Sequence, residues 1–194
     1  MINFLKGELK GYDPAIKNWD EPTIREFNGE KVEGRPTKGY GTKTFVYAGK
    51  TYKPTKWTPS ILQVKMATES LVSKELDRIV RFNFCLCGLY KTGQISIPHH
   101  SDTVPTLEDL VVGVSFGASR ILEWNQYYYQ IKRESNTSKI NILHENNYLG
   151  SQQYLLEDGD VYIFDGNSQM TSTHAIPSME DVGKRISLTF RTGL

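Results

Sequence analysis

Two residues near the middle of the chain, His100 and Asp102, are spaced so that both could bind one metal ion. They end the run Ile-Ser-Ile-Pro-His-His-Ser-Asp, and residues i and i+2 of an extended strand project from one face. A third ligand from a distant strand would complete two histidines and one carboxylate, a set that suits non-haem iron(II). His99 should point to the opposite face, and His144 lies in a polar stretch that we expect to be exposed. His174 is therefore the candidate third ligand.

The segment 185–191, Arg-Ile-Ser-Leu-Thr-Phe-Arg, alternates polar and apolar side chains without interruption. As a strand it would pack Ile186, Leu188 and Phe190 into the core, and its other face would carry Arg185, Ser187, Thr189 and Arg191. Two inward arginines are costly to bury without an anion. The planar fork of Arg185 matches the far carboxylate of 2-oxoglutarate, whose keto acid would chelate the iron. The alternative is an exposed edge strand with solvated arginines.

The elements that must position these residues are mostly short strands. Gly, Asn, Asp or Pro punctuates a series of apolar or alternating runs, at 81–90, 94–100, 110–117, 120–128, 153–156, 160–164 and 185–191. This pattern predicts an α+β, mainly β protein, built as a β-sandwich or jelly roll with one or two outer helices. The first 60 or so residues look irregular, and the polar segment 129–152 predicts a long loop or an extended hairpin.

One segment, 59–79, has helical character. Leu62, Met66, Leu71 and Leu76 recur at near-helical spacing behind a Pro-Ser start, which predicts one helix or two short ones. We expect 1–194 to form a single domain, with an N-terminal extension and lid over about 1–58 and a jelly-roll core over about 81–194.

The composition sets broad limits on the class of protein. The 23 basic and 22 acidic residues nearly cancel, so any nucleic-acid signal must be local. We find no signal-peptide pattern and no apolar run of about 18 residues. We therefore expect an intracellular protein, cytoplasmic or (if from a eukaryote) nuclear, that does not associate with a membrane. Cys85 and Cys87 are too few for a zinc site and are expected to be reduced. Because the motif strands face inward, we expect a monomer.

The order and spacing of the candidate residues resemble the AlkB family of 2-oxoglutarate dioxygenases, from about residue 35 to the C-terminus. That family has a tyrosine before a His-x-Asp, a distal histidine, and then Arg-x-(Asn or Ser)-x-Thr-x-Arg. Here Tyr90 stands ten residues before His100, and Arg185 stands eleven after His174. Segments 112–120 and 158–166 also resemble family strands.

The resemblance implies a fold, a set of cofactors and roles for particular residues. The fold would be a double-stranded β-helix, and the cofactors would be Fe(II), 2-oxoglutarate as co-substrate, and O2. It also implies that Tyr90 and Arg185 hold 2-oxoglutarate, with Ser187 on the same motif and Arg191 close to the co-substrate.

Two positions depart from the family pattern. Gly88 stands where an asparagine is common, which removes one hydrogen bond to the co-substrate. Val104 replaces an acid that would face the exocyclic nitrogen of a damaged base, so the substrate is open. Glu108 or Asp109 could substitute for that acid.

A local basic strip at 35–57 points to nucleic acid. It contains one arginine, five lysines, five aromatic residues and no acid, and such interleaving suits single-stranded nucleic acid. The segment also resembles the AlkB nucleotide-recognition lid, with Arg35, Tyr40, Tyr47 and Trp57 in the expected order. The alternative is a solvated hairpin whose aromatic rings pack on the core.

The leading functional hypothesis is oxidative demethylation of N-alkylated bases in single-stranded or damaged DNA or RNA. The target base would have to leave its stack to enter the iron pocket. A second hypothesis keeps the iron chemistry but hydroxylates a protein, a lipid or another non-damage substrate. A third is a non-enzymatic jelly-roll binding module.

Overall fold

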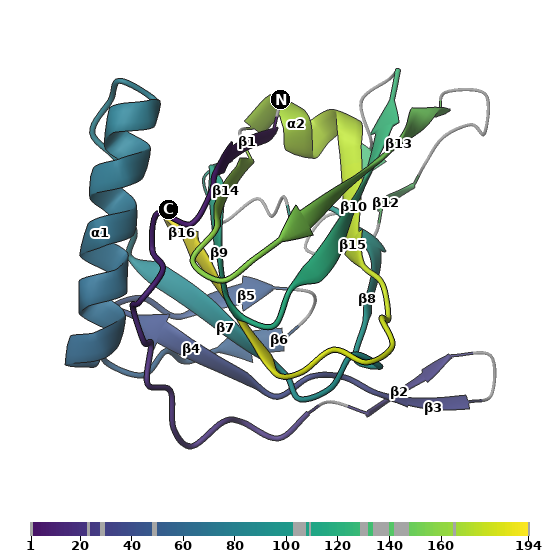
Figure 1. Cartoon of the computed structure of the whole chain (residues 1–194), viewed down its shortest axis with the longest axis horizontal. Helices are drawn as coiled ribbons and strands as arrows, with labels where there is room; N and C mark the ends of the chain where they lie inside the picture. Colours follow the sequence, from purple (N-terminus) through teal and green to yellow (C-terminus); the bar gives the residue numbers. More distant parts are fainter. Residues whose placement is uncertain are drawn as a thin grey trace.

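A computed structural model describes residues 2–22, 24–27, 30–47, 50–102, 108, 110–128, 132–133, 140–141, 148–164 and 166–193. Its central feature is a pair of antiparallel sheets that face each other (Figure 1). The larger sheet has the order β1 (Ile2–Leu5), β14 (Val161–Phe164), β9 (Val111–Gly117), β16 (Arg185–Arg191), β7 (Phe84–Tyr90) and β4 (Thr37–Gly41). The smaller has the order β13 (Tyr148–Leu156), β10 (Arg120–Tyr127), β15 (Ser172–Ile176) and β8 (Ile97–His100). This arrangement confirms the predicted mainly β jelly roll.

Three two-stranded sheets extend from this core. They are β2 (Ile24–Phe27) with β3 (Glu30–Glu33), β5 (Phe45–Tyr47) with β6 (Lys50–Tyr52), and β11 (Lys132–Arg133) with β12 (Ile140–Asn141). The expectation of irregular structure over the first 60 residues was therefore partly wrong, since short strands occupy parts of this segment while residues 6–22 contain no helix or strand. Main-chain pairing overrides a weak local pattern there, because β1 and β4 form the two edges of the larger sheet.

The predicted helix is a single element, α1 (Pro59–Glu75). The Thr58 side chain accepts a hydrogen bond from the backbone N–H of Ile61 at 3.4 Å, and a proline in the first turn suits this end. The buried positions are Ile61, Val64, Thr68, Glu69 and Val72. The apolar face predicted from the leucines and Met66 was therefore partly wrong.

The buried face of α1 differs from the predicted one because it includes two polar residues. Leu62 and Met66 are 39% and 60% exposed. Thr68 donates its hydroxyl proton to the Val64 carbonyl at 2.7 Å. Glu69 accepts from the backbone N–H of Phe82 at 2.7 Å and pairs with Lys65. Once their polar groups are bonded, these side chains can be buried at little cost.

Two apolar clusters lie on opposite faces of the larger sheet. The outer cluster joins α1 to the sheet through residues such as Ile61, Leu188 and Phe190, and α1 stands against this outer face in Figure 1. It includes Cys85 and Cys87, which are free thiols, and burial raises the pKa of Cys85. The inner cluster lies between the two sheets, where the space next to the functional side chains is formed.

Neither α1 nor the short helix α2 (Gly166–Thr171), the helices in the described part of the chain, has the length and apolar character needed to cross a bilayer.

Candidate metal centre and its cavity

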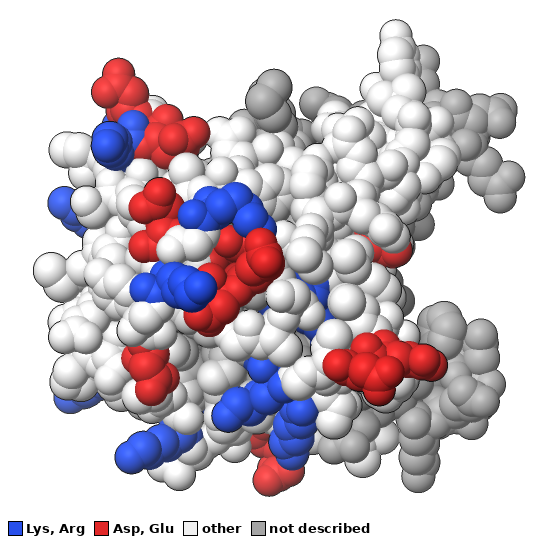
Figure 2. Space-filling view, viewed as in Figure 1, with Lys and Arg blue, Asp and Glu red and all other residues white. Residues whose placement is uncertain are grey.

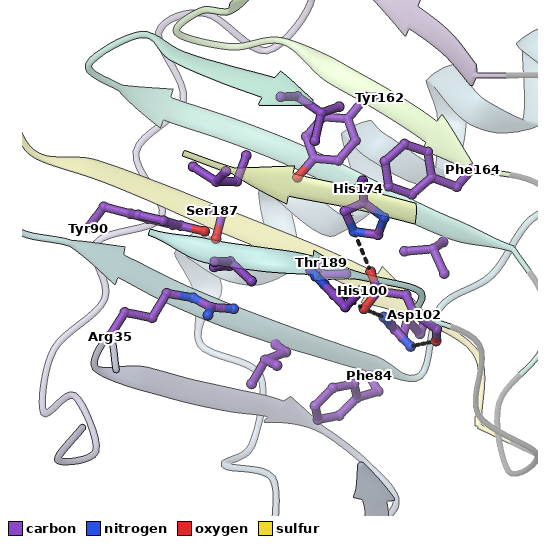
Figure 3. A pocket seen from close by; sticks show the side chains of 16 residues that line it. Arg35, Phe84, Tyr90, His100, Asp102, Tyr162, Phe164, His174, Ser187 and Thr189 are labelled. Carbon is purple, nitrogen blue, oxygen red and sulfur yellow. Dashed lines mark hydrogen bonds and ion pairs between the residues drawn. The ribbon is translucent and has the colours of Figure 1, made fainter. Parts of the chain in front are cut away.

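Strand register brings the predicted metal ligands together. Strand β15 pairs with β8 so that His174 lies directly opposite His100, and Asp102 follows two residues after the end of β8. The Nε2 atoms of His100 and His174 lie 3.5 and 3.3 Å from the two carboxylate oxygens of Asp102 (Figure 3). One ligand atom from each side chain falls within 4.8 Å of the other two. A single ion can therefore contact all three.

The two histidines present Nε2 to this point for different reasons. Nδ1 of His100 is 2.9 Å from the Pro98 carbonyl, and donating there leaves the Nε2 lone pair free. His174 is 6% exposed, and its ring packs against those of Phe164 and Trp124. Burial lowers the pKa of His174 to about 4, with a further contribution from His100 and partial opposition from Asp102. His174 is thus neutral at pH 7, the form that binds metals.

Asp102 is held in its ionised form. Burial alone would raise the pKa of its carboxyl. The Arg191 guanidinium and the two histidines together lower this pKa by more than burial raises it, so it lies well below its usual range. Nη2 of Arg191 is 2.7 Å from Oδ1, and Nη1 donates to the Asp102 carbonyl at 2.6 Å. The backbone N–H of Asp102 donates to Oε1 of Gln169 at 3.1 Å.

Gln169 is a functional contact that the sequence did not indicate. It belongs to α2, and its main-chain carbonyl also accepts from the Ser101 hydroxyl at 2.8 Å. A lone glutamine in a short polar stretch has no periodic signal that could have singled it out.

His99 and Glu108, which the structure describes, stand apart from this cluster. His99 faces away, as predicted, with its ring nitrogens 3.2 Å from Oγ1 of Thr173 and 3.3 Å from Nδ2 of Asn125. Glu108 is exposed, and its backbone N–H donates to the Thr192 carbonyl at 2.9 Å. His144, Val104 and Asp109 lie outside the described residues.

Strand β16 turns its polar face inward, as the alternation predicted. It pairs with β7 and β9, so that Arg185 lies opposite Tyr90 and Ser187 opposite Gly88. Arg185 is 0% exposed, and its Nε donates to the Ser115 hydroxyl at 2.8 Å. Its guanidinium carbon lies 4.8 Å from the centre of the Tyr90 ring, while Nη1 and Nη2 are buried without any hydrogen-bond partner.

A cavity of about 640 Å³, measured to its open mouth, lies between the sheets. His100, Asp102 and His174 line one part, and Tyr90, Ser187 and Arg35 line another (Figure 3). Apolar side chains supply most of the rest: Phe84, Leu86, Ile97, Val111, Leu122, Phe164 and Ile176. Arg185 lies behind Tyr90 and is not among the lining side chains.

The predicted nucleotide-binding residues are dispersed. Arg35 points into the cavity. Tyr40 is 3% exposed within the outer cluster, and Trp57 packs against the same cluster with Lys65 over its ring. The Tyr47 side chain lies outside what the structure describes. For Tyr40 and Trp57 this placement favours the alternative in which the aromatic rings pack on the core.

Residues 15–191 match the family model described as the 2OG-Fe(II) oxygenase superfamily. The chain belongs to this superfamily. Its cofactors are Fe(II), 2-oxoglutarate and O2, as predicted. The chain is also 26% identical over 171 residues to the uncharacterized protein R406 of Acanthamoeba polyphaga mimivirus, covering 85% of this chain and 76% of that protein.

A solved structure, that of OsALKBH1, shares the fold. It matches with a TM-score of 0.62 and 17% identity, over 98% of this chain and 97% of the other. The likeness confirms the AlkB-like jelly roll that the motifs predicted.

The side chains of this cavity fit the cofactors of the superfamily. Two imidazoles and one ionised carboxylate form the donor set expected for non-haem iron(II). The unpartnered Nη atoms of Arg185 are buried donors that a carboxylate would satisfy.

The contact between Arg191 and Asp102 predicts strong energetic coupling in the metal-free protein. Arg191→Met and Asp102→Asn should each lower the free energy of unfolding by about 3 kcal/mol, because each leaves the other partner buried and less well paired. The double variant should lose about 2 kcal/mol less than the sum. Urea denaturation in the presence of a chelator measures all three.

The surface pair Lys38–Asp20, at 3.2 Å, is the control, and its coupling should stay below about 1 kcal/mol. Strictly additive losses for Arg191 and Asp102 would contradict the coupling.

Proposed function

We propose that this chain is an Fe(II)/2-oxoglutarate-dependent dioxygenase that oxidatively demethylates N-alkylated bases in DNA or RNA. His100, Asp102 and His174 are the iron ligands. The observation that carries the proposal is the convergence of these three side chains, on one wall of a cavity whose far end holds buried, unpaired arginine donors.

The co-substrate belongs at that far end. Tyr90 and Ser187 turn their hydroxyl groups into the cavity (Figure 3). The guanidinium carbon of Arg185 lies 4.8 Å from the centre of the Tyr90 ring. In this proposal the far carboxylate of 2-oxoglutarate is bound by these groups, and its keto acid points toward the three metal ligands.

The chain's own residues account for orientation and for the exclusion of water. Fe(II) with 2-oxoglutarate supplies oxidation of a C–H bond by O2, and an N-methyl group hydroxylated in this way is released as formaldehyde. The apolar walls, including Leu122, Phe164 and Ile176, limit water around the metal ligands. Arg191 keeps Asp102 ionised, and the buried ring of His174 stays neutral.

Nucleic acid is the proposed substrate class because of the N-terminal segment and the AlkB-like fold. Lys43, Lys53 and Lys56 are exposed and can contact phosphates. Figure 2 shows several basic side chains along the lower part of one face, with acidic side chains beside them. Elsewhere on this face acids and bases are mixed.

A second candidate is a 2-oxoglutarate hydroxylase that acts on a protein side chain, a lipid or another non-damage substrate. Two observations favour it. Tyr40 and Trp57 pack against the core and do not line the cavity, and Val104 replaces the acid expected near a damaged base. Membership of an oxygenase superfamily favours either enzyme over a binding module.

Two adjacent histidines give a matched test of the metal site. His100→Ala should weaken Fe(II) binding at least about 100-fold. Replacing even a residue that only hydrogen-bonds to a metal ligand lowers metal affinity about 10–100-fold, and His100 is a ligand itself. His99→Ala should leave Fe(II) affinity nearly unchanged, since its ring faces Thr173 and Asn125. Anaerobic calorimetry measures the Fe(II) affinity of both variants, and the colour formed on adding 2-oxoglutarate gives a second readout of the bound iron. Equal losses in the two variants would remove His100 from the ligand set.

The substrate class is tested with single-stranded DNA and RNA oligonucleotides that carry 3-methylcytosine or 1-methyladenine. Incubation with Fe(II), ascorbate and 2-oxoglutarate should remove the methyl group, as read by mass spectrometry. The His100→Ala variant and unmethylated oligonucleotides are the controls. If 2-oxoglutarate is converted to succinate while every oligonucleotide is untouched, the second candidate function replaces the first.

A further inference from the structure

Gly88 leaves a gap that the Arg35 side chain fills. A Cβ atom built on Gly88 would lie 2.3 Å from Nε and 2.9 Å from Cδ of Arg35. The same position would be 3.0 Å from the hydroxyl oxygen of Ser187. Any side chain at residue 88 would therefore displace Arg35, so the glycine and the arginine form one structural unit.

The backbone around Arg35 is fixed by the larger sheet. The Pro36 carbonyl accepts from the backbone N–H of Leu89 at 2.9 Å, and Thr37 lies opposite Gly88 in the pairing of β4 with β7. The Thr37 carbonyl also accepts from the backbone N–H of Asp20 at 2.8 Å. These main-chain bonds direct the Arg35 side chain over β7 and into the cavity.

The Arg35 side chain has a hydrogen-bond donor without a partner. Its Nε is buried without a hydrogen-bond partner, and its guanidinium carbon lies 5.5 Å from the centre of the Tyr90 ring. Arg185 approaches the same ring at 4.8 Å, with both Nη atoms unpartnered. The Asp102 carboxylate in the cavity pairs with Arg191 and with His100 and His174. Arg120 also lies 5.2 Å from the tyrosine ring, so three arginines approach one tyrosine, and in the part of the chain that the structure describes no carboxylate pairs with Arg35 or Arg185.

The two arginines differ in their access to the cavity. Arg35 is a lining side chain and Arg185 is not. Figure 3 shows Arg35, Tyr90 and Ser187 gathered at one end, away from His100, Asp102 and His174. A ligand that spans the cavity from the metal ligands would therefore present its far end to Arg35.

We propose that Arg35 is a co-substrate-binding residue that, together with Tyr90 and Ser187, binds the far carboxylate of 2-oxoglutarate, and that Gly88 is required to admit it. The proposal rests on the function proposed above. It assigns Arg35 a role in dicarboxylate selectivity, whereas the sequence suggested a contact with the nucleotide. It also explains why a position commonly occupied by asparagine in AlkB proteins is glycine here, since an arginine from the N-terminal segment takes that space.

The test measures the dissociation constant of 2-oxoglutarate for the anaerobic Fe(II)-loaded protein by calorimetry. Arg35→Ala and Gly88→Ala should each weaken binding about tenfold to hundredfold, the range for a lost hydrogen bond to a charged group. The double variant should bind no more weakly than Arg35→Ala, because Gly88→Ala acts only by displacing Arg35. A 2-oxo acid without the far carboxylate, such as 2-oxopentanoate, should bind Arg35→Ala and the unchanged protein equally.

Two comparison variants separate the possible failures. Lys38 lies close to Arg35 in the chain but does not line the cavity. Lys38→Ala should therefore leave the affinity for 2-oxoglutarate unchanged. Arg185→Ala tests the proposed function itself. If Arg185→Ala weakens 2-oxoglutarate binding while Arg35→Ala and Gly88→Ala do not, the role of Arg35 is wrong and the proposed function stands.

Three other results would also be decisive. If Arg185→Ala, Arg35→Ala and Gly88→Ala all leave the affinity unchanged, the co-substrate site itself is wrong. Additive losses from Arg35→Ala and Gly88→Ala would overturn the link between the two residues. A loss in Arg35→Ala that is equal for 2-oxoglutarate and 2-oxopentanoate would overturn the contact with the far carboxylate.

Discussion

Burying arginine side chains between two β-sheets is the constraint on which the interior of this protein depends, because each guanidinium brings a charge and five N–H donors. The chain meets this cost in different ways. Arg120 donates from Nη2 to the main-chain carbonyls of Ile95 and Pro177 at 2.7 and 2.6 Å, although its Nε has no hydrogen-bond partner. Arg191 is paired with Asp102. Arg185 and Arg35 keep buried nitrogens without partners, and both lie against Tyr90.

This uneven distribution gives the cavity two chemically different ends. At one end, Arg191 keeps a carboxylate ionised beside two imidazoles, and so favours binding of a cation. At the other end, unused donors favour binding of an anion. Antiparallel register fixes both ends, because β15 sets His174 opposite His100 and β16 sets Arg185 opposite Tyr90. A molecule with a chelating group and a distant carboxylate matches both ends.

Much of this site could be predicted from the sequence, because its residues lie on strands with regular alternation. The inward face of 185–191 follows from a period of two. The opposite orientations of His99 and His100 follow from the same rule. The His-x-Asp spacing was also sufficient to pair His100 with Asp102, although Asp102 lies beyond the end of its strand.

The parts that could not be predicted depend on tertiary contacts. Gln169 reaches Asp102 from a short helix whose sequence has no periodicity. The placement of Arg35 depends on the absence of a side chain at Gly88, which lies far away in the sequence. The buried face of α1 includes Thr68 and Glu69, whose hydrogen bonds to Val64 and Phe82 no hydrophobic pattern reveals.

The same limit applies to the aromatic residues of the N-terminal strip. Tyr40 and Trp57 suggested stacking platforms for bases, but composition cannot distinguish a ring that packs on the core from one that meets a ligand. Burial depends on the neighbouring elements, here the outer cluster between α1 and the larger sheet.

The most direct test of the central claim is anomalous diffraction from crystals grown without oxygen in the presence of Mn(II) and 2-oxoglutarate. We predict one manganese peak about 2.0–2.3 Å from Nε2 of His100, Nε2 of His174 and a carboxylate oxygen of Asp102. We also predict that the far carboxylate of 2-oxoglutarate lies at the end of the cavity formed by Tyr90, Arg35 and Arg185. A manganese peak elsewhere, or a co-substrate whose far carboxylate is remote from Tyr90 and both arginines, would contradict this claim.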